Sequence, residues 1–166
     1  MTTAYISLLH DCFRDEVWGE RFYALLAEKR KRAHRQLAVI RVLMTVEEAM
    51  QQHLGLLLHR HGLSGGVGVN DEDADAKATE LAAHYSGVSW DIFILKFETS
   101  IPPFVTKYRR LLAMAPGKDR EIVQLFVDHE CALHEFTKME RSGRQRSSLN
   151  PLWRILERSQ ELSVVR

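Results

Sequence analysis

Residues 126–140 read F-V-D-H-E-C-A-L-H-E-F-T-K-M-E, a run without glycine or proline in which apolar side chains recur at helical spacing. With about 100° between successive residues, one face of this helix and its preceding turn gathers five apolar side chains: Ile122, Val123, Phe126, Leu133 and Phe136. His129 and Glu130 project from the same face. A buried carboxylate or imidazole is costly unless it is paired, hydrogen-bonded or bound to a metal ion. Other segments must therefore supply partners for these two groups.

The segment before this helix predicts another long apolar helix. Ser89 is a suitable N-cap, and A-P-G-K-D at 115–119 separates this helix from the next one. Aromatic and aliphatic side chains share one face of the segment: Trp90, Phe93, Ile94, Phe97, Ile101, Phe104, Val105, Tyr108 and Leu112. Pro102 and Pro103 interrupt it, so we expect a kink or two abutting helices there. Glu98 lies at the margin of the apolar face.

The N-terminal residues 3–31 predict a first long helix with an inward carboxylate. Glu20 falls between Val17 and Ala24 on its apolar face. The basic run E-K-R-K-R at 28–32 suits a solvated helix C-terminus. No aromatic residues are interleaved with these charges, which argues against a nucleic-acid-binding patch.

Residues 33–61 predict a second long helix with several polar groups near its apolar face. Glu47 falls near the middle of that face, Gln51 lies close beside it and Glu48 lies on its edge. Either Glu47 or Glu48 can be the inward carboxylate. His53 points the opposite way on the helical wheel, so we expect it on the surface.

The remaining segments complete an all-α protein. The glycine-rich residues 62–73 predict a flexible linker, a short helix follows at about 73–84, and Asn150 with Pro151 opens a C-terminal helix ending near residue 162. Four long amphipathic segments predict an antiparallel four-helix bundle, at about residues 3–141, with short extra helices before the third long helix and at the C-terminus. At 166 residues we expect one domain, 1–166.

Composition excludes several partners. The net charge of +1 provides no field that would favour nucleic acid or an anionic membrane. No stretch approaches the roughly 20 apolar residues of a membrane span, and the N-terminus lacks the pattern of a signal peptide. Cys12 and Cys131 fit no metal or redox spacing and are interpreted as reduced thiols. We therefore expect a cytoplasmic protein.

Several polar groups are expected to face the interior of the bundle. Because isolated buried carboxylates are rare, this indicates that they share one binding site or one network. The inward groups are Glu20 on the first long helix, Glu47 with Glu48 and Gln51 on the second, and His129 with Glu130 on the fourth. Carboxylate oxygens with an imidazole suit iron or manganese in a bundle core, and zinc is also compatible. Two other interpretations remain open: a protein-only network with Arg21 or Arg41, and a metal-free ligand pocket.

The chain resembles the ferritin-like superfamily of four-helix bundles with carboxylate-bridged di-iron sites. The resemblance covers about residues 8–141. It rests on Glu20, on the run L-M-T-V-E-E-A-M-Q-Q-H-L of the second helix and on H-E-x-A-L-x-x-F of the fourth. Family members carry a lone Glu on each of two helices and Glu-x-x-His on each of the other two. Glu20 matches one lone Glu, and Glu98 could match the other.

The Glu-x-x-His pattern is incomplete in this chain. On the second helix the histidine position holds Gln51 after Glu48, or Met50 after Glu47. On the fourth helix Leu133 follows Glu130 at that position, and the inward His129 is the candidate substitute.

The resemblance implies an iron- or manganese-dependent oxidase or hydroxylase. Such a protein uses O₂ or peroxide on a small organic substrate. Glu20, Glu47 or Glu48, His129 and Glu130 would bind the metal, and Gln51 would orient a carboxylate or ligate weakly.

Two alternatives compete with this expectation. One is a ferritin-like bundle without metal that serves as an interaction or small-ligand-binding module. The other is the haem-oxygenase-like fold, which also sets Glu and His inward from several helices. The wide apolar coverage of the first helix and the tryptophans at 18, 90 and 153 would suit a homodimer.

Overall fold

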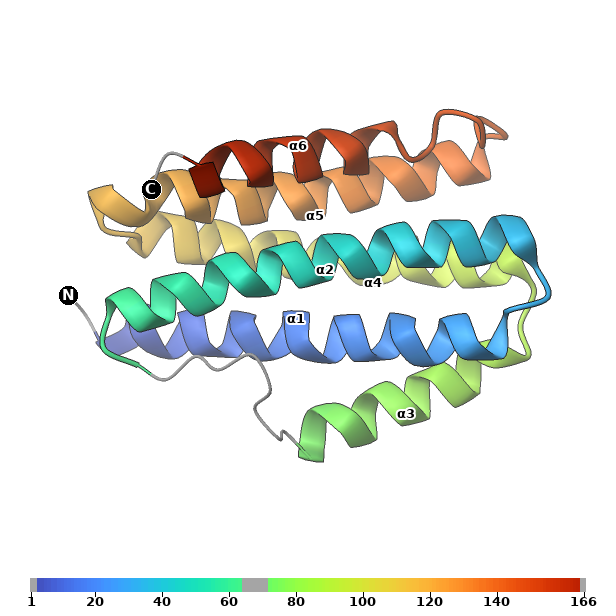
Figure 1. Cartoon of the computed structure of the whole chain (residues 1–166), viewed down its shortest axis with the longest axis horizontal. Helices are drawn as coiled ribbons and strands as arrows, with labels where there is room; N and C mark the ends of the chain where they lie inside the picture. Colours follow the sequence, from blue (N-terminus) through green and yellow to red (C-terminus); the bar gives the residue numbers. More distant parts are fainter. Residues whose placement is uncertain (1–2, 64–71, 165–166) are drawn as a thin grey trace. The chain divides into compact units, whose positions relative to one another are not determined.

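The computed structural model describes residues 3–63 and 72–164 (Figure 1). Within these ranges the chain forms six α-helices, one short 3-10 helix and no β-strand, so the prediction of an all-α protein is confirmed. Most of the segment interpreted as a linker, residues 64–71, lies outside the described residues. The chain divides into two compact units, an N-terminal unit of residues 2–88 and a C-terminal unit of residues 89–166.

The N-terminal unit contains helices α1 (Thr3–Lys29), α2 (His34–Arg60) and α3 (Glu72–Ser86). The short connection between α1 and α2 makes them antiparallel neighbours, and α3 packs against α1 (Figure 1). The observed ends of α1 and α2 lie within two residues of those expected from the sequence. Long uninterrupted amphipathic patterns are the elements that sequence predicts best.

Helix α3 is attached to α1 mainly through polar and aromatic contacts. Arg21 pairs with Asp75 at 2.9 Å, and the Lys77 ammonium lies 4.0 Å from the centroid of the Trp18 ring. Among the described side chains of α3, the buried ones are small: Ala78 and Ala82. Little apolar area therefore holds this helix in place.

Arg30 joins the α1–α2 turn to the end of α3. Its guanidinium donates to the Gln36 side-chain oxygen at 2.8 Å and to the backbone carbonyls of Tyr85 at 2.8 Å and Val88 at 2.6 Å. Burial lowers the pKa of Arg30 from its ordinary value. The planar guanidinium suits this role because it presents several donors in fixed directions.

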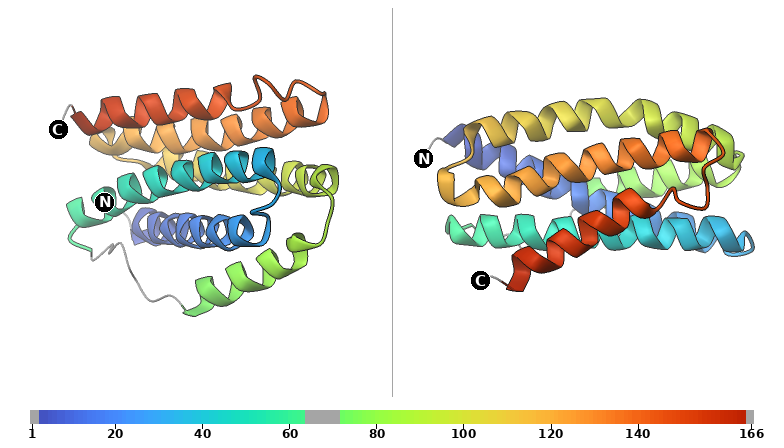
Figure 2. Two further views of the ribbon diagram at one scale, coloured as in Figure 1. Left: turned by 45° about the vertical axis from the view of Figure 1, so that its right-hand side comes forward. Right: turned by 90° about the horizontal axis from the view of Figure 1, so that it is seen from above.

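The C-terminal unit contains α4 (Trp90–Met114), the 3-10 turn η1 (Gly117–Asp119), α5 (Arg120–Arg141) and α6 (Asn150–Val164). Helix α5 packs against both α4 and α6 (Figure 2). Ser89 caps α4 by accepting from the Ile92 amide, as its sequence predicts. Helix α5 ends before Gly143, whose φ of +77° is a left-handed conformation that favours glycine.

Helix α4 continues through both of its prolines, so the expectation of two abutting helices is wrong. Pro102 and Pro103 both lie inside α4 and are exposed. A proline removes the hydrogen bond to the carbonyl one turn earlier. On an exposed face water can bond such a carbonyl, which lowers the cost of keeping the helix intact.

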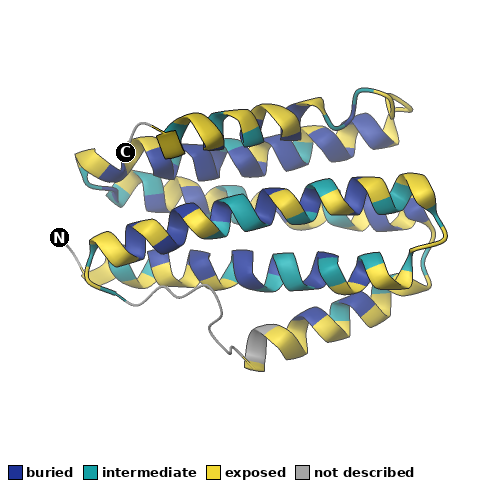
Figure 3. Ribbon diagram, in the orientation of Figure 1, coloured by how far each residue is buried: buried dark blue, intermediate teal, exposed yellow. Residues whose placement is uncertain are grey.

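Buried residues recur along each long helix (Figure 3), and in α1 and α2 they include a seven-residue repeat. On α1 the repeat alternates steps of four and three residues: Tyr5, Leu9, Cys12, Glu16, Gly19, Tyr23 and Leu26. On α2 it does the same: Val39, Leu43, Val46, Met50, His53 and Leu57. This spacing is typical of long helices that pack side by side at a shallow angle.

Each unit thus contributes one antiparallel pair of long helices, α1 with α2 and α4 with α5. The four-helix bundle of ferritin-like type and the single domain over 1–166 stay predictions. None of the described helices combines the length and apolar character needed to cross a bilayer.

Candidate functional site

The middle of the α1–α2 pair carries four carboxylates, which we call the acidic cluster: Glu16, Glu20, Glu47 and Glu48. Glu16 and Glu20 lie one turn apart on the same face of α1. Glu16 is 2% exposed and Glu47 is 7% exposed, while Glu20 and Glu48 are half-buried. Burying ionised carboxylates is costly unless positive charge or hydrogen bonds compensate.

Contact between the two helices at this level runs through Glu47 and Gly19. The Oε2 atom of Glu47 lies 3.1 Å from the position that a Cβ would take at Gly19, and its carboxyl carbon lies 3.3 Å away. The Glu47 carboxylate therefore rests directly against the backbone of α1, next to Glu20. This resolves the choice between the two neighbours, because Glu47 is the buried carboxylate and Glu48 lies at the edge.

Glu20 has a perturbed pKa in the folded protein. Burial and the negative charge of Glu48 raise the pKa of Glu20, and the positive charge of Arg21 opposes this in part. Like-charged carboxylates that share a site favour protonation of one of them. A bound cation would reverse this preference, so metal uptake here would release a proton.

Two further buried polar residues that the sequence predicted as ligands lie in the C-terminal unit. His129 is 0% exposed and Glu130 is 5% exposed, both on α5. Their burial agrees with the expectation that both project from the apolar face of this helix.

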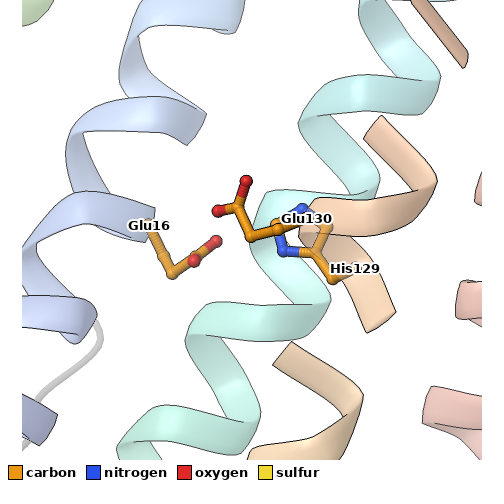
Figure 4. A group of neighbouring side chains, drawn as sticks. All are labelled: Glu16, His129 and Glu130. Atoms are coloured by element: carbon orange, nitrogen blue, oxygen red, sulfur yellow. The ribbon is translucent and has the colours of Figure 1, made fainter. Parts of the chain in front are cut away.

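Three buried side chains are of the types that could hold a metal ion: Glu16, His129 and Glu130 (Figure 4). Each can offer one ligand atom, a carboxylate oxygen or an imidazole nitrogen. The first belongs to α1 of the N-terminal unit and the other two belong to α5 of the C-terminal unit. Carboxylate oxygens and imidazole nitrogens are ligand types that iron, manganese and zinc all accept.

The surroundings of the other two predicted ligands, Gln51 and Glu98, do not indicate a metal site. Gln51 is half-buried on α2, one turn after Glu47. Glu98 accepts a hydrogen bond from Arg141 of α5 at 2.8 Å, in an ion pair at the edge of the α4–α5 pair. Arg141 therefore gives Glu98 a partner of opposite charge within the C-terminal unit.

Glu16 was not identified from the sequence, and His53 was wrongly expected on the surface. His53 is 2% exposed. Both residues occupy positions of the seven-residue repeat, Glu16 between Cys12 and Gly19 on α1 and His53 between Met50 and Leu57 on α2. The expected apolar face included Leu37 and Met44, which are only half-buried. It therefore lay to one side of the buried stripe and placed His53 outside it. The repeat itself was the signal that would have found both.

No protein-family model, curated protein or solved structure matches the chain. The function therefore rests on the chemistry of the buried side chains.

Proposed function

We propose that this protein binds a divalent metal ion, iron or manganese, through carboxylates of the acidic cluster. The observation that carries the proposal is the burial of Glu16 on α1 and Glu47 on α2. The same two helices carry Glu20 and Glu48, and the negative charge of Glu48 raises the pKa of Glu20. A divalent cation offsets both the desolvation of the buried carboxylates and the repulsion between the half-buried ones. Such a site would stabilise the ionised forms of all four groups.

His129 and Glu130 are proposed as further ligands on the basis of their residue types and burial. An imidazole added to carboxylate oxygens favours iron, manganese or zinc over calcium and magnesium, which prefer all-oxygen sites. Glu130→Gln and His129→Leu test this assignment separately from the acidic cluster.

The proposed activity is oxidation or hydroxylation of a small organic substrate, as in the ferritin-like class. Its support is the resemblance of the glutamate- and histidine-containing runs together with two antiparallel pairs of long helices. The oxidant would be O₂ or peroxide, which bound iron would activate, and the chain would supply carboxylates that hold the iron with open coordination positions. Oxygen consumption by the iron-loaded protein, with and without candidate substrates, tests the activity.

A second candidate function is a metal-free bundle that serves as an interaction or ligand-binding module. The observations in its favour are Gln51 at the position of an expected histidine and the engagement of Glu98 by Arg141. In this case the acidic cluster would be a protein-only network.

Elemental analysis of the untagged protein, purified without chelators, separates the two candidates. We expect iron or manganese at one or two ions per chain. Less than about a tenth of an equivalent, still absent after anaerobic Fe(II) loading, would overturn the metal proposal.

The variant Glu16→Gln tests whether the metal ion binds at the acidic cluster. We expect affinity for Mn²⁺ to fall by at least about tenfold, a loss seen even for residues that only support a ligand. Glu28→Gln, an exposed carboxylate on the same helix, is the matched control and should bind normally. The unfolding temperature of the wild type should also rise with added Mn²⁺, because a ligand that binds only the folded state stabilises it.

A further inference from the structure

Gly19 lies in the interior of α1, where glycine is a poor helix former. Among the described glycines, those with positive φ are Gly62 and Gly143, so Gly19 has no backbone conformation that requires glycine. The reason for a glycine here must lie in the space that its missing side chain leaves.

That space is filled by one group, the end of the Glu47 side chain. A Cβ at residue 19 would meet Oε2 at 3.1 Å, the carboxyl carbon at 3.3 Å and Cγ at 3.7 Å, all atoms of Glu47. The first two distances are tighter than ordinary van der Waals contact, so Glu47 would have to shift by a few tenths of an ångström. The atoms that must shift include the oxygen that would bind a cation.

We propose that Gly19 is a positioning residue, which rests on the proposed metal-binding function. By leaving room beside α1, it lets the Glu47 carboxylate lie at the level of Glu16 and Glu20. Metal ligands must keep their distances within about 0.2 Å, so a displacement of this size is enough to weaken coordination. The loss of helix stability that glycine causes would then be tolerated because glycine preserves the position of the Glu47 carboxylate.

The test compares Mn²⁺ affinity, measured by titration calorimetry on the full chain, with the thermal stability of the metal-free protein. For Gly19→Ala we expect affinity to fall about tenfold or more. The unfolding temperature of the metal-free variant should stay equal or rise, because alanine favours the helix. Gly87→Ala is the matched control, since a Cβ at Gly87 of the same unit meets nothing within 4 Å.

A second variant separates positioning from a general packing effect. Glu47→Asp shortens the side chain and withdraws the carboxylate from α1. Adding Gly19→Ala to Glu47→Asp should then cost less than about threefold in Mn²⁺ affinity, because the atoms that clashed have moved away. A full tenfold loss in this background would overturn the positioning role.

The outcomes distinguish the two proposals. If the wild type binds no Mn²⁺ or Fe²⁺, the metal function fails and the role of Gly19 fails with it. If the wild type binds and Gly19→Ala binds equally well, the metal function stands and the positioning role alone is overturned. A drop in affinity accompanied by unfolding of the metal-free variant would also overturn it, because the effect would then be structural.

Discussion

Glu20 lies on α1 where burial and the charge of Glu48 both favour its protonated form. The folded protein therefore keeps this proton at pH values where the unfolded chain, with an ordinary glutamate pKa of 4.5, has released it. For a raised carboxyl pKa, the contribution to stability is present below the unfolded pKa and is lost as pH rises through the folded pKa. Glu20 thus destabilises the metal-free protein progressively as pH rises from the unfolded pKa to the folded pKa.

Replacing Glu20 by glutamine removes this pH dependence. In urea unfolding of the metal-free protein, we expect Glu20→Gln to gain stability relative to the wild type as pH rises above about 4.5. Saturating Mn²⁺ should abolish the gain, because the ion favours the ionised carboxyl. Glu28→Gln on the exposed side of α1 is the control. Parallel stability profiles for Glu20→Gln and the wild type would contradict the assignment.

At the same scale, the sequence predicted the burial of some candidate ligands and left the surroundings of others undetermined. Glu47, His129 and Glu130 were expected inward and are buried. Glu98 could not be assigned, because its partner Arg141 lies 43 residues away and only the packing of α4 on α5 brings them together. The space beside Gly19 is likewise filled by a residue of another helix, Glu47 of α2, so no local sequence pattern predicts it.

Helix ends were predictable because their signals are local. Ser89 caps α4 through its side-chain oxygen, and Gly143 ends α5 through its left-handed backbone; each acts only on its nearest neighbours in the chain. The rotation of the buried stripe was less predictable. Leu37 and Met44 are apolar yet half-buried, whereas the polar Glu16 and His53 lie on the repeat. Burial of a helix face is determined by what packs on it, and a wheel drawn from apolar residues alone misses polar members of the stripe.

A buried carboxylate links the elements of the C-terminal unit. Glu140 near the end of α5 accepts hydrogen bonds from the Trp90 indole at 2.9 Å and from the Ser148 hydroxyl. Trp90 opens α4, and Ser148 lies in the connection to α6. The two donors therefore hold the start of α4 and the α5–α6 connection to the same point of α5.

The variant Trp90→Phe measures how much the Trp90–Glu140 hydrogen bond contributes to the free energy of unfolding. The variant keeps an aromatic ring but removes the indole donor to a buried charged group, a loss of about 1.5–3 kcal/mol. We expect the free energy of unfolding in urea to fall by about that amount. Trp153→Phe, at a tryptophan that is 47% exposed, is the matched control and should stay within about 0.5 kcal/mol of the wild type. Equal stabilities for the two variants would show that the bond contributes nothing.

At the scale of the whole molecule, the two units raise the question of cooperativity. A single domain unfolds in one transition that all probes report alike. Cys12 is buried in the N-terminal unit and Cys131 is exposed in the C-terminal unit. In a Cys131→Ala background, labelling of Cys12 therefore reports the opening of the N-terminal unit alone.

We expect Cys12 to become reactive over the same range of urea concentrations in which helical circular dichroism is lost. That result would support the single domain predicted from the sequence. Labelling at clearly lower urea would instead show that the N-terminal unit opens by itself. Cys131 in the otherwise unchanged protein provides the reference rate for an accessible thiol.

The tryptophans also bear on the expected homodimer. Trp90 bonds Glu140, and Trp18 lies beneath the Lys77 ammonium. Two of the three tryptophans therefore have roles within the chain, and only Trp153 retains a largely exposed ring. The homodimer stays a prediction, and of the three tryptophans that suggested it only Trp153 is largely exposed.

The attachment of α3 has a consequence for how the N-terminal unit responds to its medium. This helix buries two alanines and depends on an ion pair, a cation over a ring and the bonds of one arginine. Dissolved salt weakens ion pairs between exposed charges, whereas it leaves the apolar contacts between α1 and α2 largely intact. Local opening of α3 therefore costs less as ionic strength rises, and each opening uncovers Trp18 and Phe22 on the outer side of α1. Salt concentration becomes a control on how often an aromatic surface of this protein meets the solvent.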